Sequence, residues 1–396
     1  MIQKIICMAI IIGIISGSTC FAMEDTQTVY DDLPAALVIN SQTQLPATSS
    51  ILIEQTTGNV LYEYNPDVSL PPASITKIMT LLLVIEALER GEITLDTMVT
   101  CSEHANSMGG SQIWFKVGEQ LSVHDLLKAT AISSANDSAV ALAEQVSGSE
   151  EEFVIKMNER AKELGMNSTN FVNATGLDAE NHLSTARDIA IMSAELLRHP
   201  KIIEYSTIWM DNLRGGKTEL VNTNKLVRFY KGATGLKTGT TNKAGYCLSG
   251  SATRDNLSLI AVTMGSKTSD ERFSITRGLL DYGFNNFAFS KLEDISEKLA
   301  PIPVKKGVAP EVCVEYAPIA GILINKSDKG KVQQEITLAP YVRAPIEKGQ
   351  KIGTVVVHIN GEKQLEYPLI AKETIDKMTF TKAFTMLLKT MCGSNC

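Results

Sequence analysis

The pattern of hydrophobic and polar positions divides the 396-residue chain into four segments. Residues 1–22 carry one apolar run, and residues 23–289 change between helical and strand periods. Residues 290–370 show short runs of strand period, and residues 371–396 carry an apolar stripe at helical spacing. We therefore predict a large mixed domain and a small β-rich domain, flanked by two terminal segments with other roles.

The large segment opens with a strand, a turn and a second strand. Residues 50–54 and 60–64 flank a turn at 57–59, which is typical of a β-hairpin. After two prolines, an apolar helix is expected over residues 74–90, and Gly91 ends it. Further helices are predicted over residues 123–146 with a break at 133–137, over 151–164, from 185 to just before Pro200, and over 271–282.

Later in the same segment the hydrophobic period changes to two. Neighbouring strands are predicted over residues 236–240, 245–252 and 256–264. Together with the hairpin they indicate an α+β domain with a largely antiparallel sheet, whose first and last strands come from opposite ends of the domain. Beyond residue 289, short strands predict a small all-β domain over residues 304–306, 312–315, 322–324, 334–338, 353–359 and 364–367.

The two terminal segments predict contact with a membrane. Residues 1–22 place Lys4 before an apolar run and end in small residues, which is typical of a secretory signal cut after Ala22; an uncleaved anchor is less favoured because the run is short for a bilayer. We therefore expect export. The stripe in residues 371–396 favours a helix lying in the membrane interface, and the alternative is a terminal helix packed on the β domain. The stripe consists of Phe380, Phe384, Leu387, Leu388 and Met391.

Composition excludes several other kinds of protein. A net charge of −7 and the lack of a long basic run argue against a nucleic-acid partner. The five cysteines beyond the signal are scattered, which excludes a disulfide scaffold, although Cys392 and Cys396 are near enough to pair. The five histidines form no pair with metal-ligand spacing, so no metal and no cofactor is expected.

Three short motifs indicate a catalytic site. They are Ser74-Ile75-Thr76-Lys77, Ser134-Ala135-Asn136 and Lys237-Thr238-Gly239, separated by about 60 and about 100 residues. Each motif alone is a weak signal. Their common order along one chain makes a shared site the better interpretation.

The first motif predicts a nucleophile and its base. A serine hydroxyl needs a base, and Lys77 lies one helical turn after Ser74, on the same face. A lysine acts as a base only if burial or a second cation lowers its pKa, and Lys237 is a candidate for that cation. The alternative is a serine that caps a helix beside a solvated lysine. The apolar residues that follow favour a central helix and an interior Lys77.

The second motif lies at the break between two predicted helices. Ser134 is placed to relay a proton between Lys77 and the leaving group, and Asn136 to orient Lys77 or bind a substrate amide. An ordinary helix cap is the alternative. A second S-x-N stands at Ser168-Thr169-Asn170, and Ser134 is preferred because it lies at a helix break.

The third motif lies on a predicted strand. Lys237 and Thr238 can hold an anionic carboxylate there, Gly239 allows close approach of the backbone, and the amides of Ser74 and Thr240 would form an oxyanion hole. An edge strand with a surface lysine is the alternative.

Arg272 is a further candidate for carboxylate recognition. Its planar guanidinium offers paired donors, and it follows three strands that begin at the Lys237 motif. A structural arginine paired with Asp270 or Glu271 is equally compatible with the sequence.

Beyond the motifs, the chain resembles the D-alanyl-D-alanine carboxypeptidases, a family of low-molecular-mass penicillin-binding proteins with a serine nucleophile. The resemblance covers nearly the whole chain; where the family often has glycine, this chain has Ala135. The similar stretches are residues 72–80, 173–177, 184–188, 235–241 and 344–350.

The resemblance implies a transpeptidase-like domain with helices on both sides of an antiparallel sheet, followed by the β domain and an amphipathic helix. It implies that Ser74 attacks the bond between two terminal D-alanines of a peptidoglycan stem peptide, and that water hydrolyses the acyl-enzyme. β-Lactam antibiotics would acylate the same serine. From the predicted signal and terminal helix, we expect an exported protein that is attached peripherally to the outer side of the cytoplasmic membrane.

Two alternatives remain at this point. A serine β-lactamase shares the motifs but usually needs an added glutamate, which residues 180–184 only partly supply. A non-catalytic cell-wall-binding protein is disfavoured because every motif residue is present.

Overall fold

A five-stranded antiparallel sheet forms the centre of the large domain. In the computed structural model, which describes residues 33–40, 43–316, 319 and 321–391, the strand order is β2-β1-β9-β8-β7. Strands from opposite ends of the large domain therefore meet in one sheet, as predicted, because β1 pairs with β9 over its whole length. The strands are β1 (Ser49–Glu54), β2 (Val60–Tyr64), β7 (Ala233–Thr241), β8 (Gly245–Arg254) and β9 (Leu257–Ser266).

Helices cover both faces of this sheet. Alternate residues of β1 point to opposite faces: Ile51 and Ile53 belong to the core shared with α1, and Leu52 belongs to the core shared with α9. The predicted α+β class is confirmed by this arrangement. The helices are α1 (Lys77–Glu89), α2 (Glu103–Asn106), α3 (Val123–Ile132), α4 (Asn136–Ser147), α5 (Glu150–Glu163), α6 (Ala186–Leu196), α7 (Ile203–Ser206), α8 (Leu226–Phe229) and α9 (Ser269–Asn286).

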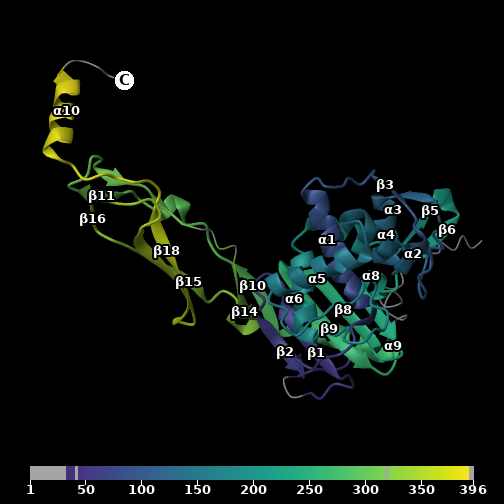
Figure 1. Cartoon of the computed structure of the whole chain (residues 1–396). Coiled ribbons are helices and arrows are strands. Elements are labelled where there is room, and N and C mark those ends of the chain that lie inside the picture. Colours follow the sequence, from purple (N-terminus) through teal and green to yellow (C-terminus); the bar gives the residue numbers. More distant parts are fainter. Residues whose placement is uncertain (1–32, 41–42, 317–318, 320, 392–396) are drawn as a thin grey trace, which may run out of the picture.

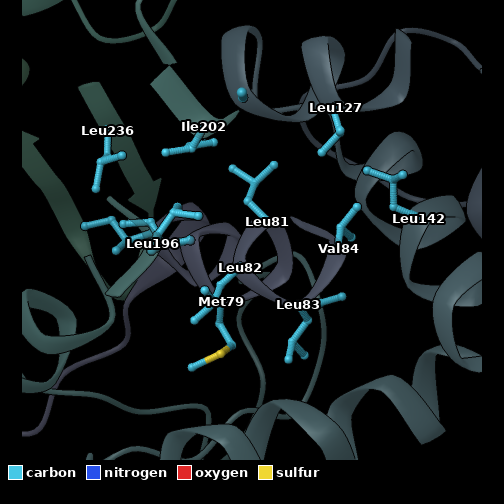
Figure 2. Packing of buried hydrophobic residues seen from close by; sticks show 14 of the residues in the cluster. Met79, Leu81, Leu82, Leu83, Val84, Leu127, Leu142, Leu196, Ile202 and Leu236 are labelled. Carbon is cyan, nitrogen blue, oxygen red and sulfur yellow. The ribbon is translucent and has the colours of Figure 1, made fainter. Parts of the chain in front are cut away.

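Helix α1 is buried almost all round, as its apolar sequence predicts. Its side chains pack against Leu127 of α3, Leu142 of α4 and Leu196 of α6 (Figure 2). Leu236 of β7 lies in the same cluster, so α1 connects the helical layer to the edge of the sheet. Lys77 and Thr80, the polar side chains at the start of α1, are therefore held inside the protein.

The start of this helix differs from the prediction. Residues 73–76 form a 3-10 turn, η2 (Ala73–Thr76), and the α-helix begins only at Lys77. Ala73 has a left-handed φ of 49°, which an α-helix does not allow. Gly176 packs directly on this residue: a β-carbon there would lie 1.8 Å from the carbonyl oxygen of Ala73. Backbone packing between distant segments thus decides the local conformation.

Two hairpins that sequence reasoning missed lie beside the helices. The first joins β3 (Met98–Thr100) to β4 (Gln120–Ser122). The second joins β5 (Met210–Leu213) to β6 (Thr218–Val221). Their strands are only three or four residues long, too short to show a clear period.

The second domain is β-rich, as predicted. Its larger sheet has the order β13-β18-β17-β15, and a smaller one has the order β12-β11-β16. Strand β10 (Phe287–Lys291) pairs with β14 (Gly321–Asn325), so the predicted boundary after residue 289 falls within a strand. The remaining strands are β11 (Ile302–Lys305), β12 (Glu311–Val312), β13 (Val314–Glu315), β15 (Val332–Leu338), β16 (Val342–Arg343), β17 (Lys351–Ile359) and β18 (Glu362–Ala371).

The chain ends in helix α10 (Phe380–Met391). Figure 1 shows α10 in yellow at the end of the β domain that is farthest from the large domain. Its apolar residues are exposed, with Phe380 at 86% and Met391 at 76%, so the alternative of a helix packed on the β domain is wrong. No helix in the described part of the chain is long and apolar enough to cross a membrane. The predicted signal, the Cys392–Cys396 pair and the last residues lie outside the described residues.

Candidate active site

Ser74 and Lys77 lie in contact where the 3-10 turn passes into α1. Lys77 Nζ lies 3.1 Å from Ser74 Oγ. Lys77 is completely buried, whereas Ser74 is half-buried and reaches the surface. The one-turn spacing in the sequence therefore does bring the amine to the hydroxyl, as predicted.

Two acceptors hold the Lys77 amine in place. Asn136 Oδ1 lies 2.6 Å from Nζ, and the carbonyl oxygen of Thr175 lies 2.7 Å away. Asn136 is itself held because its Nδ2 donates to the carbonyl of Gly109 at 2.6 Å. Asn136 thus orients Lys77, one of the two roles expected for it, and Thr175 is a contact that sequence reasoning missed.

Ser134 lies at the break between α3 and α4, where the chain turns with a left-handed φ of 62°. Its Oγ is buried and has no hydrogen-bond partner within the described protein. A buried hydroxyl without a partner is unusual, and it is available to a substrate or a proton in transit. The second S-x-N lies elsewhere: the Thr169 hydroxyl donates to Asp188, at the start of α6.

Burial sets the electrostatics of the site. It lowers the pKa of Lys77 well below the usual value, the positive charge of Lys237 lowers it further, and Asp137 opposes both. A lysine in this state is neutral for more of the time and is able to accept a proton. The predicted role of Lys237 as the second cation agrees with this geometry.

Strand β7 forms the side of the site that faces the turn carrying Ser74. Lys237 is 1% exposed, and burial followed by the charge of Arg272 lowers its pKa to about 7. A β-carbon on Gly239 would lie 2.9 Å from the carbonyl oxygen of Pro72 and 3.1 Å from Ala73 Cβ. Gly239 therefore allows β7 to lie directly against the turn that carries Ser74. Strand β7 is the edge strand of the sheet, but Lys237 is buried, so the alternative of a surface lysine is wrong.

Arg272 reaches the same strand from α9. Its Nη1 donates to Thr240 Oγ1 at 3.0 Å and to the carbonyl of Gly239 at 3.2 Å. Neither Asp270 nor Glu271 forms a salt bridge with it in the described part of the chain; the Glu271 carboxylate instead completes the cap of α9 at Thr268. Arg272 is thus placed beside the Lys237 motif by contacts with β7.

Thr238 faces another segment. Its hydroxyl donates to Thr223 Oγ1 at 2.6 Å, so residue 223, just after β6, also borders the site. No motif in the sequence pointed to Thr223.

A buried histidine supports the turn that carries Ser74. His182 is 2% exposed and accepts a hydrogen bond from the backbone N–H of Val172 through Nδ1. Its Nε2 therefore carries the proton and donates to Thr76 Oγ1 at 2.8 Å. Burial lowers the pKa of His182 to about 4, so the ring is neutral at neutral pH. No motif in the sequence pointed to this role of His182.

The glutamate that a β-lactamase would need is not beside the serine. Glu180 is exposed and forms no hydrogen bond with the Ser74–Lys77 pair in the described structure. The buried Glu150 is engaged elsewhere: it accepts from the N–H of Ala174 at 2.8 Å and contacts His104 at 2.6 Å.

One group of possible metal ligands lies away from this site. Glu86, Glu195 and His199 have ligand atoms within 4.8 Å of one another. Arg160 lies among them, 2.8 Å from Glu86 and 2.7 Å from Glu195, and its guanidinium supplies the positive charge that the carboxylates need. The cluster is therefore explained as an ion-pair network.

Known proteins and family models resemble this chain over both domains. Residues 36–268 match the family model described as D-alanyl-D-alanine carboxypeptidase, and residues 297–377 match the C-terminal domain of penicillin-binding protein 5. The chain is 45% identical to the D-alanyl-D-alanine carboxypeptidase DacF of Bacillus subtilis over 87% of this chain and 89% of the relative. It is 36% identical to DacC of Escherichia coli over 88% of this chain and 89% of the relative.

Solved structures show the same architecture. Penicillin-binding protein 5 of Haemophilus influenzae is 33% identical, with a TM-score of 0.76 over 86% of this chain and all of the other. Penicillin-binding protein D2 of Listeria monocytogenes, solved with ampicillin bound, is 33% identical, with a TM-score of 0.56 over 61% of this chain and 98% of the other.

Proposed function

Because this chain belongs to the D-alanyl-D-alanine carboxypeptidase family of serine peptidases that act on peptidoglycan, we propose that Ser74 is its nucleophile and Lys77 the general base. The observation that carries this assignment is the 3.1 Å contact between Lys77 Nζ and Ser74 Oγ. A buried amine with a lowered pKa accepts the hydroxyl proton as the oxygen attacks.

Acylation of Ser74 is the first half-reaction. Ser74 Oγ forms an ester with the carbonyl carbon between the two D-alanines, and its proton passes to Lys77. The carbon–nitrogen bond breaks, and the terminal D-alanine leaves once its nitrogen has received that proton. The unpartnered hydroxyl of Ser134 is the relay between the amine and the leaving nitrogen. Water attacks the ester in the second half-reaction and restores Ser74.

Strand β7 would bind the substrate. Lys237 and Arg272 would donate to the terminal carboxylate, and the Thr238 hydroxyl would join them by turning away from Thr223. This carboxylate is the feature that separates a carboxypeptidase substrate from an internal peptide. The backbone N–H groups of Ser74 and Thr240 would stabilise the oxyanion, because Gly239 lets the strand lie against the turn.

β-Lactams are expected to acylate the same serine. The Listeria relative was solved in ampicillin-bound and cefotaxime-bound forms, and it shares the fold of the catalytic domain. The exposed position of Glu180 supports slow release of the acyl group, in contrast with a β-lactamase.

Two measurements on one pair of variants test the assignment. Ser74→Ala should abolish release of D-alanine from a peptide ending in D-Ala-D-Ala and should also abolish covalent labelling by penicillin. Ser133→Ala is the matched control, because Ser133 lies beside Ser134 but its hydroxyl donates to the carbonyl of Ala129. Penicillin labelling of folded Ser74→Ala protein would refute the nucleophile.

Attachment to the outer side of the cytoplasmic membrane is a separate part of the proposal. Exposed apolar side chains along α10 support it, as does the position of this helix at the far end of the β domain (Figure 1). Truncation should follow Thr379, since Ile375 is 2% exposed in the β-domain core and pairs with Ile346.

The truncated protein should lose sedimentation with anionic lipid vesicles and keep its activity on a soluble peptide. Phe384→Asp should weaken vesicle binding within the full chain, whereas Thr385→Asp is the control on the neighbouring position. Undiminished vesicle binding by the truncated protein would exclude α10 as the anchor.

A further inference from the structure

Trp114 is a large side chain in a position that does not favour it. It is 75% exposed, and its backbone has a left-handed φ of 58°. A bulky residue rarely adopts this conformation, whereas glycine would adopt it without strain. Neither packing nor backbone preference explains a tryptophan here. Strained residues of this kind gather at functional sites.

The backbone on both sides of Trp114 is held from within. Ile113 and Phe115 are buried, and their N–H groups donate to the Asp137 carboxylate at 3.1 Å and 3.0 Å. Asp137 is 1% exposed and follows Asn136, the residue that orients Lys77. The start of α4 therefore positions the catalytic amine and presents Trp114 to solvent at the same time.

Trp114 lines a shallow groove of about 580 Å³. The turn between β5 and β6 forms the facing wall, with Arg214, Lys217 and Thr218. Arg214 joins the two walls, because its Nη1 donates to the carbonyl of Ile113 at 2.9 Å and to Thr218 Oγ1 at 2.8 Å. The two walls of the groove are thus held together by hydrogen bonds from Arg214.

The groove also has a positive rim. Lys116 and Lys217 line it, and neither forms a salt bridge with any described residue. Arg214 is neutralised by Glu119, at 2.6 Å, so the two lysines supply the unbalanced charge.

Both walls continue into the active site. On one side, the carbonyl of Ser111 accepts from the N–H of Asn136 at 2.7 Å, three residues before Trp114. On the other side, β6 leads to Thr223, which accepts from Thr238. Both walls are thus hydrogen-bonded to residues of the active site.

We propose that this Trp114 groove binds the glycan end of the peptidoglycan substrate. This inference rests on the proposed function. An N-acetylated amino sugar has an apolar C–H face that suits the flat ring of tryptophan and a polar edge that suits water. Lys116 and Lys217 suit an acidic group on the same substrate. Trp114 is then a specificity-determining residue outside the catalytic group.

The test compares two substrates on the full-length protein. One is a pentapeptide ending in D-Ala-D-Ala, and the other is the same peptide attached to its N-acetylglucosaminyl-N-acetylmuramyl disaccharide. Trp114→Gly, which relieves the backbone strain, should lower kcat/KM for the disaccharide substrate by about three- to tenfold. It should leave kcat/KM for the free peptide and the rate of penicillin labelling unchanged.

Two further variants complete the design. Trp114→Tyr keeps an aromatic face and should restore most of the preference for the disaccharide substrate. Tyr341→Ala removes an aromatic residue that is 44% exposed in the β domain. It should change kcat/KM for neither substrate. Equal losses on both substrates, or no loss on the disaccharide substrate, would overturn the inference. Failure of the proposed function is distinct, because the wild type would then release D-alanine from neither substrate.

Discussion

Arg272 Nη1 donates a 3.0 Å hydrogen bond to Thr240 Oγ1, and this contact joins the first turn of α9 to the active-site strand. Arg272 is 8% exposed, and its guanidinium lies over the ring of Tyr246, 5.4 Å from the ring centre. Its Nε has no partner in the described structure. A buried donor without a partner next to Lys237 is what a site for an anionic group requires.

Replacing Arg272 should therefore affect substrates according to their carboxyl end. Arg272→Ala should lower kcat/KM for a free-acid peptide about tenfold or more, because a charge-assisted hydrogen bond contributes about 1.5–3 kcal/mol. A peptide with an amidated end should show much less difference between variant and wild type. Equal losses of kcat/KM on both peptides would show that Arg272 has only a structural role, in which it supports β7.

The charge on Lys237 should control the pH profile of acylation. Lys237→Met removes a positive charge that lowers the pKa of Lys77, so the pKa of Lys77 should rise. Since Lys77 must be neutral to act as a base, the acid limb of kcat/KM should move to higher pH. The measurement is the rate of penicillin labelling across pH.

Lys237→Arg is the matched control for this experiment. It keeps the charge, so the acid limb should stay where it is in the wild type. With a pKa of about 7, Lys237 loses its charge above neutral pH, and capture of a free-acid peptide should weaken there. Arginine does not titrate in this range, so in Lys237→Arg the decline in capture of the free-acid peptide above neutral pH should disappear. An unmoved acid limb in Lys237→Met would contradict the coupling.

Glycine at position 239 should matter more for activity than for stability. In Gly239→Val the new side chain would meet the carbonyl of Pro72 and the Ala73 β-carbon, and would push β7 away from the turn that carries Ser74. Penicillin labelling should fall by at least about a hundredfold, because misplacement by about 1 Å costs that much.

Gly250→Val on the neighbouring strand is the control. Its β-carbon would meet Leu226 and Thr276, at 2.8 Å each, within the core that α9 covers. This variant should be less stable to urea yet label normally when folded. If both variants lose labelling only in proportion to their loss of folded protein, Gly239 has no special role in the site.

Stability should fall below neutral pH because of His182. Its pKa is about 4 in the folded protein and near 6.5 in an unfolded chain. Between these values the unfolded state binds a proton that the folded state excludes, so the free energy of unfolding falls as pH falls from about 6.5 to 4. The loss attributable to His182 is roughly 3 kcal/mol at most.

Urea unfolding at pH 7 and pH 4.5 measures this effect. His182→Gln lacks the titrating ring and should show a smaller difference between the two pH values, although it is less stable at pH 7 because it loses the contact with Thr76. His358→Gln, in the β domain, should retain the wild-type difference. The same pH dependence in all three proteins would place the effect on other groups.

Much of the fold could be predicted from local sequence. The hairpin at residues 50–64 has alternating residues around a turn, and the long helix has an unbroken apolar run, so both elements are visible in short windows. The three motifs were also readable, since nucleophile and base lie one turn apart. The break at Ser134 was visible because short polar residues interrupt the helices.

The rest depends on contacts between distant segments. The Thr175 carbonyl binds Lys77 across 98 residues, and His182 contacts Thr76 across 106. A backbone carbonyl carries no sequence signal, and a histidine shows its partner only when the chain has folded. The sequence likewise did not identify the partners of Arg272, because they depend on the packing of α9 beside β7.

By itself, the sequence determined the family, the long helices and strands of the large domain and the side chains named by the three motifs, because residue type and spacing are local properties. Tertiary structure alone decided that Ser74 lies in a 3-10 turn, since the close approach of Gly176 holds Ala73 in a left-handed conformation. It also decided the lowered pKa of Lys77, because desolvation and the charge of Lys237 act through space and exist only in the packed protein.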